Sequence, residues 1–309
     1  MDVVFLADWF ADNFQRGAEL NDSALINHLN IPIDKVLCEE VKQIDEDKFY
    51  IVGNFTKLSN ETKNELIKKK NYLIYEHDHK YCITRNPFSY ITIDDGKTEI
   101  LPNPSGLVPK DNLINLDFYK AAKVVVCLTD WHEKQLNLNI DCETTNVHGS
   151  MWSIDDLDFI DQIRDSTKKT GKCAVFNDQE QVRMSDGKVY NQGKNIKNKQ
   201  GNIKYCVDNN IKYRLIPRIN DRAKFLKILA SHAALSFFPD IPETCSRLLT
   251  EARMLGLEVY TNDNSGAFHE DWFKLKGREL TDHYRNIIIP NAINLFKGYI
   301  NEYNSNSLS

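Results

Sequence analysis

The sequence predicts an α/β protein built from two Rossmann-like domains, each with a parallel sheet. One observation is a strand–loop–helix–strand unit near the C-terminus, where apolar runs at residues 234–238 and 257–262 flank a helix with one apolar stripe. A second is that similar strand-forming runs begin two separate series, at residues 3–7 and at residues 172–176. The third is length, because 309 residues can bury a core in each of two domains.

Composition indicates a globular protein of the cytoplasm. Hydrophobic residues make up 41% of the chain and charged residues 27%, and the formal net charge of −5 gives no overall attraction to nucleic acid or anionic membrane. The seven cysteines are odd in number and form no C-x-x-C pair, which is typical of reduced thiols. No apolar run approaches the length of a bilayer span and the first residues lack a basic leader, so we expect no membrane insertion.

The first strand leads into a loop that contains Arg16-Gly17-Ala18-Glu19, followed by a helix that ends near Leu29. Gly17 lets the backbone approach a ligand closely at a helix entrance, and Arg16 offers a guanidinium to a diphosphate. We predict that Arg16 and Gly17 contact the diphosphate of a bound ligand. The alternative is an ordinary turn glycine.

The strand within residues 72–81 ends in a dense group of ionisable side chains, Glu76-His77-Asp78-His79. Strands at residues 35–41 and 49–55 and a polar helix at residues 60–70 precede it. Ligands of open α/β sheets bind beyond the carboxyl ends of strands, so we predict that His77, Asp78 and His79 act as base, hydroxyl acceptor or anion contact. A zinc or iron site is one rival interpretation, although no third remote ligand is evident. A surface loop with incidental histidines is the other.

Domain limits follow from the spacing of the elements. We predict an N-terminal domain of residues 1–165, a C-terminal domain of residues 166–280 and a terminal helical segment of residues 281–309. The first domain includes a long loop at residues 85–109 and a strand at residues 124–128. The second adds helices at residues 201–209 and 221–233 around a strand at residues 213–217. The last helix, from Glu279 to Tyr303, is expected to bend at Pro290.

Two carboxylates flank the apolar stripe of the C-terminal unit. Glu243 precedes the helix and Glu251 lies about two turns along it, while Thr244 is expected to cap the helix and Gly256 to end it. Amides at a helix start suit a phosphate, and a nearby carboxylate accepts hydrogen bonds from sugar hydroxyls. The pair therefore favours a nucleotide-sugar, although two glutamates at this spacing are also common on a solvated helix.

This stretch resembles the E-x7-E segment of retaining glycosyltransferases of the GT-B fold, of the glycosyltransferase family 4 type. The resemblance implies that Glu251 holds the nucleotide ribose and that Glu243 contacts the donor sugar. It implies that amides at the helix start hold the distal phosphate, a role that falls on Thr244, Cys245 and Ser246. Family members often have a histidine that meets the donor sugar near the end of the strand within residues 72–81, and His77 or His79 would be its counterpart. Glu243 is predicted to be catalytic together with His77, Asp78 and His79.

Other stretches match the family pattern less closely. Residues 262–270 resemble its Gly-Ala turn, and Arg16-Gly17 stands where a Gly-Gly pair is usual. Lys199, with Lys197 as the next candidate, would occupy the position of a phosphate-binding lysine. Asn177-Asp178 replaces an expected Gly-Arg pair, which leaves the cation at the diphosphate open. The basic run at residues 181–204 around these lysines is otherwise a solvated loop or a contact for a polyanionic acceptor.

By resemblance, the two domains would face a cleft. Residues 1–165 would receive the acceptor, residues 166–280 would bind the nucleotide-sugar, and the C-terminal helix would cross back onto the first domain. The enzyme would be retaining and metal-independent, with no cofactor beyond its substrate, for which a UDP-sugar is favoured. Helix amides and lysine would stabilise the leaving diphosphate.

The acceptor is left open by the sequence. A short chain with a basic loop fits a phage-encoded enzyme of the host cytoplasm that glycosylates hydroxymethylcytosine in DNA after flipping the base. A polysaccharide or a small metabolite fits the acidic overall charge. A nucleotide-sugar epimerase and a non-catalytic nucleotide-sugar binder are further alternatives, and the chain is expected to be a monomer or homodimer.

Overall fold

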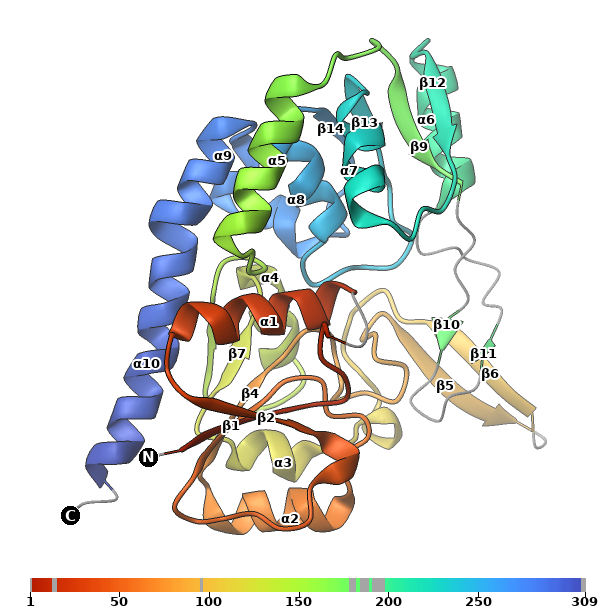
Figure 1. Cartoon of the computed structure of the whole chain (residues 1–309). Helices are drawn as coiled ribbons and strands as arrows, with labels where there is room; N and C mark the ends of the chain where they lie inside the picture. Colours follow the sequence, from red (N-terminus) through yellow and green to blue (C-terminus); the bar gives the residue numbers. More distant parts are fainter. Residues whose placement is uncertain are drawn as a thin grey trace. The chain divides into compact units, whose positions relative to one another are not determined.

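The computed structural model describes residues 2–12, 16–94, 97–177, 182–183, 189–190 and 198–306. The chain divides into two compact units, of which unit 1 comprises Met1–Ser153 with Ile288–Ser309, and unit 2 comprises Ile154–Ile287. Each unit contains a parallel sheet with helices packed on it, which confirms the predicted α/β class (Figure 1). None of the helices in the described ranges combines the length and the apolar character needed to cross a membrane.

Unit 1 is built on a six-stranded parallel sheet with the strand order β2-β1-β3-β4-β7-β8. The strands are β1 Val3–Ala7, β2 Ile33–Leu37, β3 Phe49–Val52, β4 Tyr72–Tyr75, β7 Val125–Cys127 and β8 Thr144–Asn146. The inner strands β1, β3, β4 and β7 are buried along their whole length. Their almost continuous apolar sequences suit a parallel sheet that is covered on both faces.

Helices cover the two faces of this sheet in groups. The helices are α1 Gly17–Leu29, α2 Asn60–Lys69, α3 Leu116–Ala121, α4 Asp130–Asn137 and α10 Ile289–Asn306. α1 packs with α10, α2 packs with α3, and Figure 1 shows α1 and α2 on opposite sides of the sheet. Strand β4 contacts one helix group on each face of the sheet. The ring of Tyr75 lies 5.1 Å from that of Phe296 in α10, and the ring of Tyr72 stacks on Phe118 of α3 at 4.8 Å, both measured between centroids.

The long loop predicted at residues 85–109 contains a β-hairpin. β5 Ser89–Asp94 pairs with β6 Lys97–Pro102 in antiparallel fashion, and the 3-10 helix η2 Lys110–Asn112 follows. The Asn112 side chain accepts a hydrogen bond from the Ile91 amide at 2.6 Å and donates one to the Ile91 carbonyl at 2.9 Å. Asn112 thus takes the place of a neighbouring strand at that point of β5, a tertiary contact that turn residues in the sequence do not indicate.

Unit 2 is built on a four-stranded parallel sheet with the strand order β12-β9-β13-β14. The strands are β9 Cys173–Phe176, β12 Tyr213–Ile216, β13 Ala234–Ser236 and β14 Glu258–Tyr260, with a separate antiparallel pair of β10 Val182–Arg183 and β11 Val189–Tyr190. The helices are α5 Ile154–Ser166, α6 Lys199–Asp208, α7 Arg222–Ala230, α8 Arg247–Met254 and α9 Arg278–His283. Short 3-10 turns are η1 Cys38–Glu40 in unit 1, and η3 Gly266–His269 and η4 Asp271–Lys274 in unit 2.

The limits of unit 2 differ from the predicted domain limits at residues 165 and 280. Helix α5 belongs to unit 2 because its Asp161 side chain accepts a hydrogen bond from Thr281 Oγ1 at 2.8 Å. Asp161 also forms an ion pair with Arg285 at 2.8 Å. These contacts attach the first helix of the unit to its last, and neither is visible as a local pattern in the sequence.

A π-helical turn directly precedes α10 and ends two residues before Pro290, where the sequence predicts a bend. Helix α9 ends at His283, a π-helical turn η5 Tyr284–Ile288 follows, and α10 then runs from Ile289 to Asn306. Pro290 is the second residue of α10.

Candidate functional site

The connections of unit 2 reverse direction between β9 and β13. From β9 the chain runs to β12 on one side of the sheet, and from β13 it runs to β14 on the other. Adjacent strands whose connections leave in opposite directions open a crevice at their carboxyl ends, which is where doubly wound sheets bind ligands. The chain that leaves β13 at this end carries Glu243 and then forms α8. The E-x7-E segment therefore lies at the expected ligand-binding end of the sheet.

Backbone pairing fixes Glu243 against the segment that follows β14. The Glu243 amide donates to the Asn264 carbonyl at 3.0 Å, and the Gly266 amide donates to the Glu243 carbonyl at 2.8 Å. Glu243 forms an isolated parallel bridge with Ser265 in this way. The Gly266-Ala267 turn, which the sequence matched to the family pattern, thus contacts the first glutamate of the E-x7-E segment directly.

Helix α8 begins at Arg247, two residues later than a cap at Thr244 predicts. The residue at the N-cap position is Ser246, and its side chain makes no capping hydrogen bond. The extended bridge at Glu243 holds the preceding chain away from helical geometry, which explains the late start. Thr244 and Ser246 are buried and Cys245 is half-buried, so the three predicted phosphate-binding residues form the approach to the helix and not its first turn.

Glu251 lies inside a cluster of charged side chains from three helices. Arg222 Nη2, at the start of α7, donates to Glu251 Oε1 at 3.0 Å, while its Nη1 pairs with Asp156 of α5. Arg247 Nη2 approaches the same Oε1 at 3.8 Å. Glu251 Oε2 has no hydrogen-bond partner among the residues that the structure describes. One guanidinium group therefore donates to Oε1 and a second lies near it, while Oε2 accepts no hydrogen bond from a described residue.

Arg222, Arg247 and Asp156 are site residues that the sequence analysis did not single out. Arg247 and Glu251 stand four residues apart on one helix, a spacing that could have indicated their contact. Arg222 and Asp156 reach Glu251 only through the packing of α5, α7 and α8, which no local pattern encodes. Burial lowers the pKa of Arg222, but the carboxylates of Glu251 and Asp156 more than offset this and raise it overall. Burial lowers the pKa of Arg247.

The predicted cations lie in different places. Lys199 is the first residue of α6 in unit 2 and follows Asn198, whose side chain accepts from the Gly201 amide at 2.9 Å. Arg16 occupies the N-cap position of α1 in unit 1, and Gly17 is the first residue of that helix. Lys197 lies outside the described residues.

In unit 1, both ring nitrogens of His77 face helix α1. Nε2 lies 2.6 Å from Asp22 Oδ1, and Nδ1 lies 3.4 Å from the Asn21 side-chain amide. Gly53 makes room for this arrangement, since a Cβ there would come within 2.9 Å of Asp22 Oδ2. The His77 ring is thus part of a buried polar network between β4 and α1.

Asp78 belongs to a second network, centred on buried charges. Asp78 accepts from Arg85 Nε at 2.7 Å and from Lys80 Nζ at 2.9 Å. Lys80 also pairs with Glu76, a fully buried carboxylate that accepts a hydrogen bond from Tyr119. Burial raises the pKa of Asp78, but Arg85 and Lys80 outweigh it and hold that pKa far below its usual value. The two cations therefore favour the ionised form of Asp78.

His79 is enclosed among aromatic rings and is uncharged at neutral pH. Its ring meets Tyr81 at 5.5 Å, Trp131 at 6.3 Å and His132 at 4.9 Å between centroids. Neither ring nitrogen has a hydrogen-bond partner within the described ranges, and burial lowers its pKa to about 3. His77, Asp78 and His79 thus face three different sets of neighbours, which is not how three ligands of one metal ion would lie.

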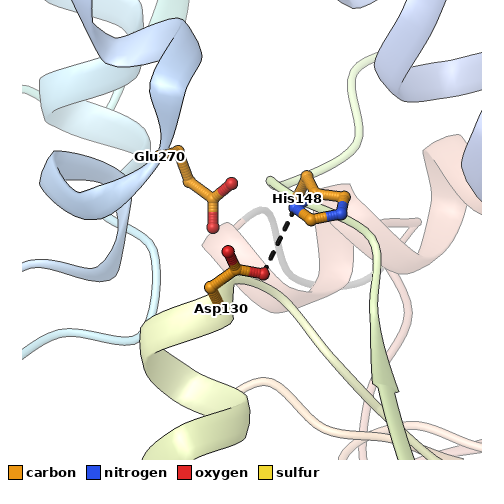
Figure 2. Close-up of side chains that lie close together, drawn as sticks. All are labelled: Asp130, His148 and Glu270. Atoms are coloured by element: carbon orange, nitrogen blue, oxygen red, sulfur yellow. Dashed lines mark ion pairs between the residues drawn. The ribbon is translucent and has the colours of Figure 1, made fainter.

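A further histidine of unit 1 lies next to a carboxylate at the protein surface. His148 Nδ1 lies 3.5 Å from Asp130 Oδ1, and both side chains are about half exposed (Figure 2). Asp130 begins α4, and His148 adopts a left-handed backbone conformation with φ of 54°. This pair was absent from the predicted site, because the two residues stand on either side of β8 in the sequence.

No family model matches the sequence, and no curated protein matches it. Among solved structures, the chain is similar to Alr3699/HepE of Anabaena crystallised with UDP and glucose, at 10% identity and a TM-score of 0.47, covering 100% of this chain and 99% of that one. A crystal structure of the same protein with UDP-glucose matches at 11% identity and a TM-score of 0.44, covering 96% and 94%. Both TM-scores are below 0.5.

Proposed function

We propose that this chain is a glycosyltransferase that transfers a sugar from a nucleotide-diphosphate-sugar, with a UDP-sugar favoured, to an acceptor hydroxyl. The observation that carries the proposal is the position of Glu251, which lies on the helix that follows the switch point of a doubly wound sheet and whose Oε2 accepts no hydrogen bond from a described residue. A carboxylate oxygen at such a place is suited to accept hydrogen bonds from a ribose, as in dinucleotide-binding folds.

The remaining donor contacts follow from the same region of unit 2. We assign the donor sugar to Glu243, because its backbone is fixed on both sides by the segment at residues 264–266. The amides of residues 244–246 and the start of α8 would receive the diphosphate, with Arg247 and Lys199 as the nearest candidates for cations. His77 stays a proposed contact of the sugar or acceptor, through a change in the hydrogen bonds that now hold its ring.

In the transfer itself, the bond between the anomeric carbon and the diphosphate oxygen breaks and a bond to the acceptor oxygen forms. The acceptor loses its proton, and the diphosphate leaves with the negative charge. We propose retention at the anomeric carbon without a metal ion, and hydroxymethylcytosine in phage DNA as the acceptor. The basic run at residues 181–204 supports a polyanionic acceptor, and steep salt dependence of acceptor binding would separate DNA from a polysaccharide or small molecule.

The donor site is tested by thermal shift and calorimetry with UDP, other nucleotides and their sugars. A ligand at a hundred times its dissociation constant stabilises the protein by about 2.7 kcal/mol. Glu251→Gln is expected to weaken UDP binding by about 10–100-fold, the worth of a hydrogen bond to a charged group. Glu279→Gln is the matched control, because Glu279 is exposed on α9 of the same unit. No shift with any nucleotide-sugar would remove the donor site from consideration.

Glu243→Gln separates the sugar contact from the nucleotide contact. We expect sugar transfer, measured as kcat/KM, to fall by about 10–100-fold while the affinity for UDP changes by less than about threefold. An equal loss in both quantities would place Glu243 at the nucleotide. Product analysis on the nucleotide-sugar without acceptor also separates a transferase from an epimerase, since only an epimerase changes the sugar in that mixture.

A further inference from the structure

We infer that Arg222 is a positioning residue that fixes the rotamer of Glu251, so that Oε2 accepts a hydrogen bond from a ribose hydroxyl. The inference rests on the proposed function of unit 2 as a nucleotide-sugar site. It adds a residue on a different helix from the E-x7-E segment, and it predicts a measurable preference of the site for a ribonucleotide over the corresponding deoxyribonucleotide.

The first step is the geometry of the guanidinium of Arg222. Its two terminal nitrogens point at two carboxylates, with Nη2 donating to Glu251 Oε1 at 3.0 Å and Nη1 pairing with Asp156. A planar guanidinium that is held at both ends has little freedom to rotate. Asp156 on α5 therefore anchors Arg222 on α7, and Arg222 in turn anchors Glu251 on α8.

The two oxygens of the Glu251 carboxylate have different surroundings. Arg222 and Arg247 both approach Oε1, at 3.0 Å and 3.8 Å. Within the described part of the chain, Oε2 has no hydrogen-bond partner, although the Glu251 side chain is only 7% exposed. A buried glutamate held by one oxygen presents the other in a single direction, and this lowers the entropy lost when a ligand hydroxyl binds there.

Neutralising the charge of Glu251 does not by itself require the contact with Arg222. Arg247, four residues before Glu251 on the same helix, already supplies a nearby cation for the carboxylate. A second arginine, from another helix and anchored by its own acid, adds orientation to the neutralisation that the first provides. Arg222 differs in this respect from Arg218, an exposed arginine in the same connection, which forms no ion pair with any described residue.

The test compares the dissociation constants of UDP and 2′-deoxy-UDP by calorimetry on the full chain. We expect the wild-type protein to prefer UDP by about tenfold, the effect of one hydrogen bond to a buried acceptor. Glu251→Gln and Arg222→Ala should both bring this ratio to about one, whereas Arg218→Ala should leave it at the wild-type value. Because the ratio is measured on folded protein with both ligands, a purely structural role for Arg222 would lower the melting temperature and leave the ratio unchanged.

If Arg222→Ala does not fold, Asp156→Asn removes the anchor from the far side of the guanidinium and should reduce the ratio by at least half. A wild-type ratio near ten that survives both Arg222→Ala and Asp156→Asn overturns the inference while the proposed function stands. Absence of binding of UDP and every nucleotide-sugar to the wild-type protein overturns the proposed function instead. Binding of both nucleotides with equal affinity by the wild-type protein overturns the role assigned to Glu251 Oε2, and the inference with it.

Discussion

Replacing Lys80 by methionine is expected to lower the free energy of unfolding of unit 1 by about 3–5 kcal/mol. Lys80 is 2% exposed and pairs with Glu76, which is fully buried at the carboxyl end of β4. Methionine fills a similar volume but leaves the Glu76 carboxylate charged and without its cation. The hydrogen bond from Tyr119 to Glu76 does not compensate for that loss. Chemical denaturation at neutral pH measures the effect.

The decrease in unfolding free energy caused by Lys80→Met is expected to become smaller as the pH is lowered. Burial raises the pKa of Glu76 above its ordinary value of 4.5 even with Lys80 present, and removing the lysine takes away the main opposing influence. The native variant then binds a proton more tightly than the unfolded chain, so its stability is highest below the ordinary pKa and falls as the pH rises through the raised one. If the difference in unfolding free energy between Lys80→Met and the wild type were the same at acidic and neutral pH, this explanation would be contradicted.

Two further variants control for the interpretation. Lys123→Met breaks a pair with Glu302 at 2.8 Å, but Glu302 is 57% exposed, so the expected change is within about 1 kcal/mol. The double variant Lys80→Met with Glu76→Gln removes the stranded charge and should recover part of the stability lost in Lys80→Met. An equal loss in the single and double variants would show that packing, not charge, causes the effect.

Acid sensitivity of unit 1 is the second large effect that we expect, and His79→Phe should remove much of it. The buried ring has a pKa of about 3 against an ordinary value of 6.5. Between pH 6.5 and about pH 3, the unfolded chain therefore binds a proton at His79 and the native state does not. Stability is full above pH 6.5 and falls with decreasing pH, by about 3–5 kcal/mol near pH 3 at about 1.4 kcal/mol per pKa unit.

Phenylalanine suits the aromatic surroundings of His79, since no hydrogen bond within the described residues is lost by the exchange. We expect the variant to match the wild type at pH 7 within about 1.5 kcal/mol and to show a shallower dependence of unfolding free energy on pH below 6.5. His269→Gln is the control, because His269 is exposed and should leave the slope unchanged. Identical slopes for His79→Phe and the wild type would mean that other groups carry the acid sensitivity.

Periodicity predicted the elements of the sheets well, because each is a local pattern. The apolar runs at residues 3–7, 172–176 and 234–238 correspond to β1, β9 and β13 in two parallel sheets. Where the prediction differed, a tertiary contact decided the outcome. Asn112 stabilises a hairpin in a region rich in turn residues, and the bridge between Glu243 and Ser265 delays the start of α8.

In the candidate site too, some residues can be found from local sequence patterns and others only from the packing of the helices. The spacing of Glu243 and Glu251 is readable from the sequence because one precedes a short helix and the other lies within it. The sequence also grouped His77, Asp78 and His79 by their adjacency, yet successive side chains that leave a strand point to different neighbours. Arg222 could not be found from the sequence, since its relation to Glu251 depends on how α7 packs beside α8.

The order in which the units can complete their folds follows from the place of helix α10. Unit 2 is one continuous stretch of chain, and Asp161 joins its first and last helices. Unit 1 is interrupted by unit 2, and the face of its sheet that carries Tyr75 receives its contact with Phe296 only when α10 has been synthesised. During translation, the unit that begins second therefore has all its residues first, while the N-terminal sheet lacks the part of its cover that α10 supplies.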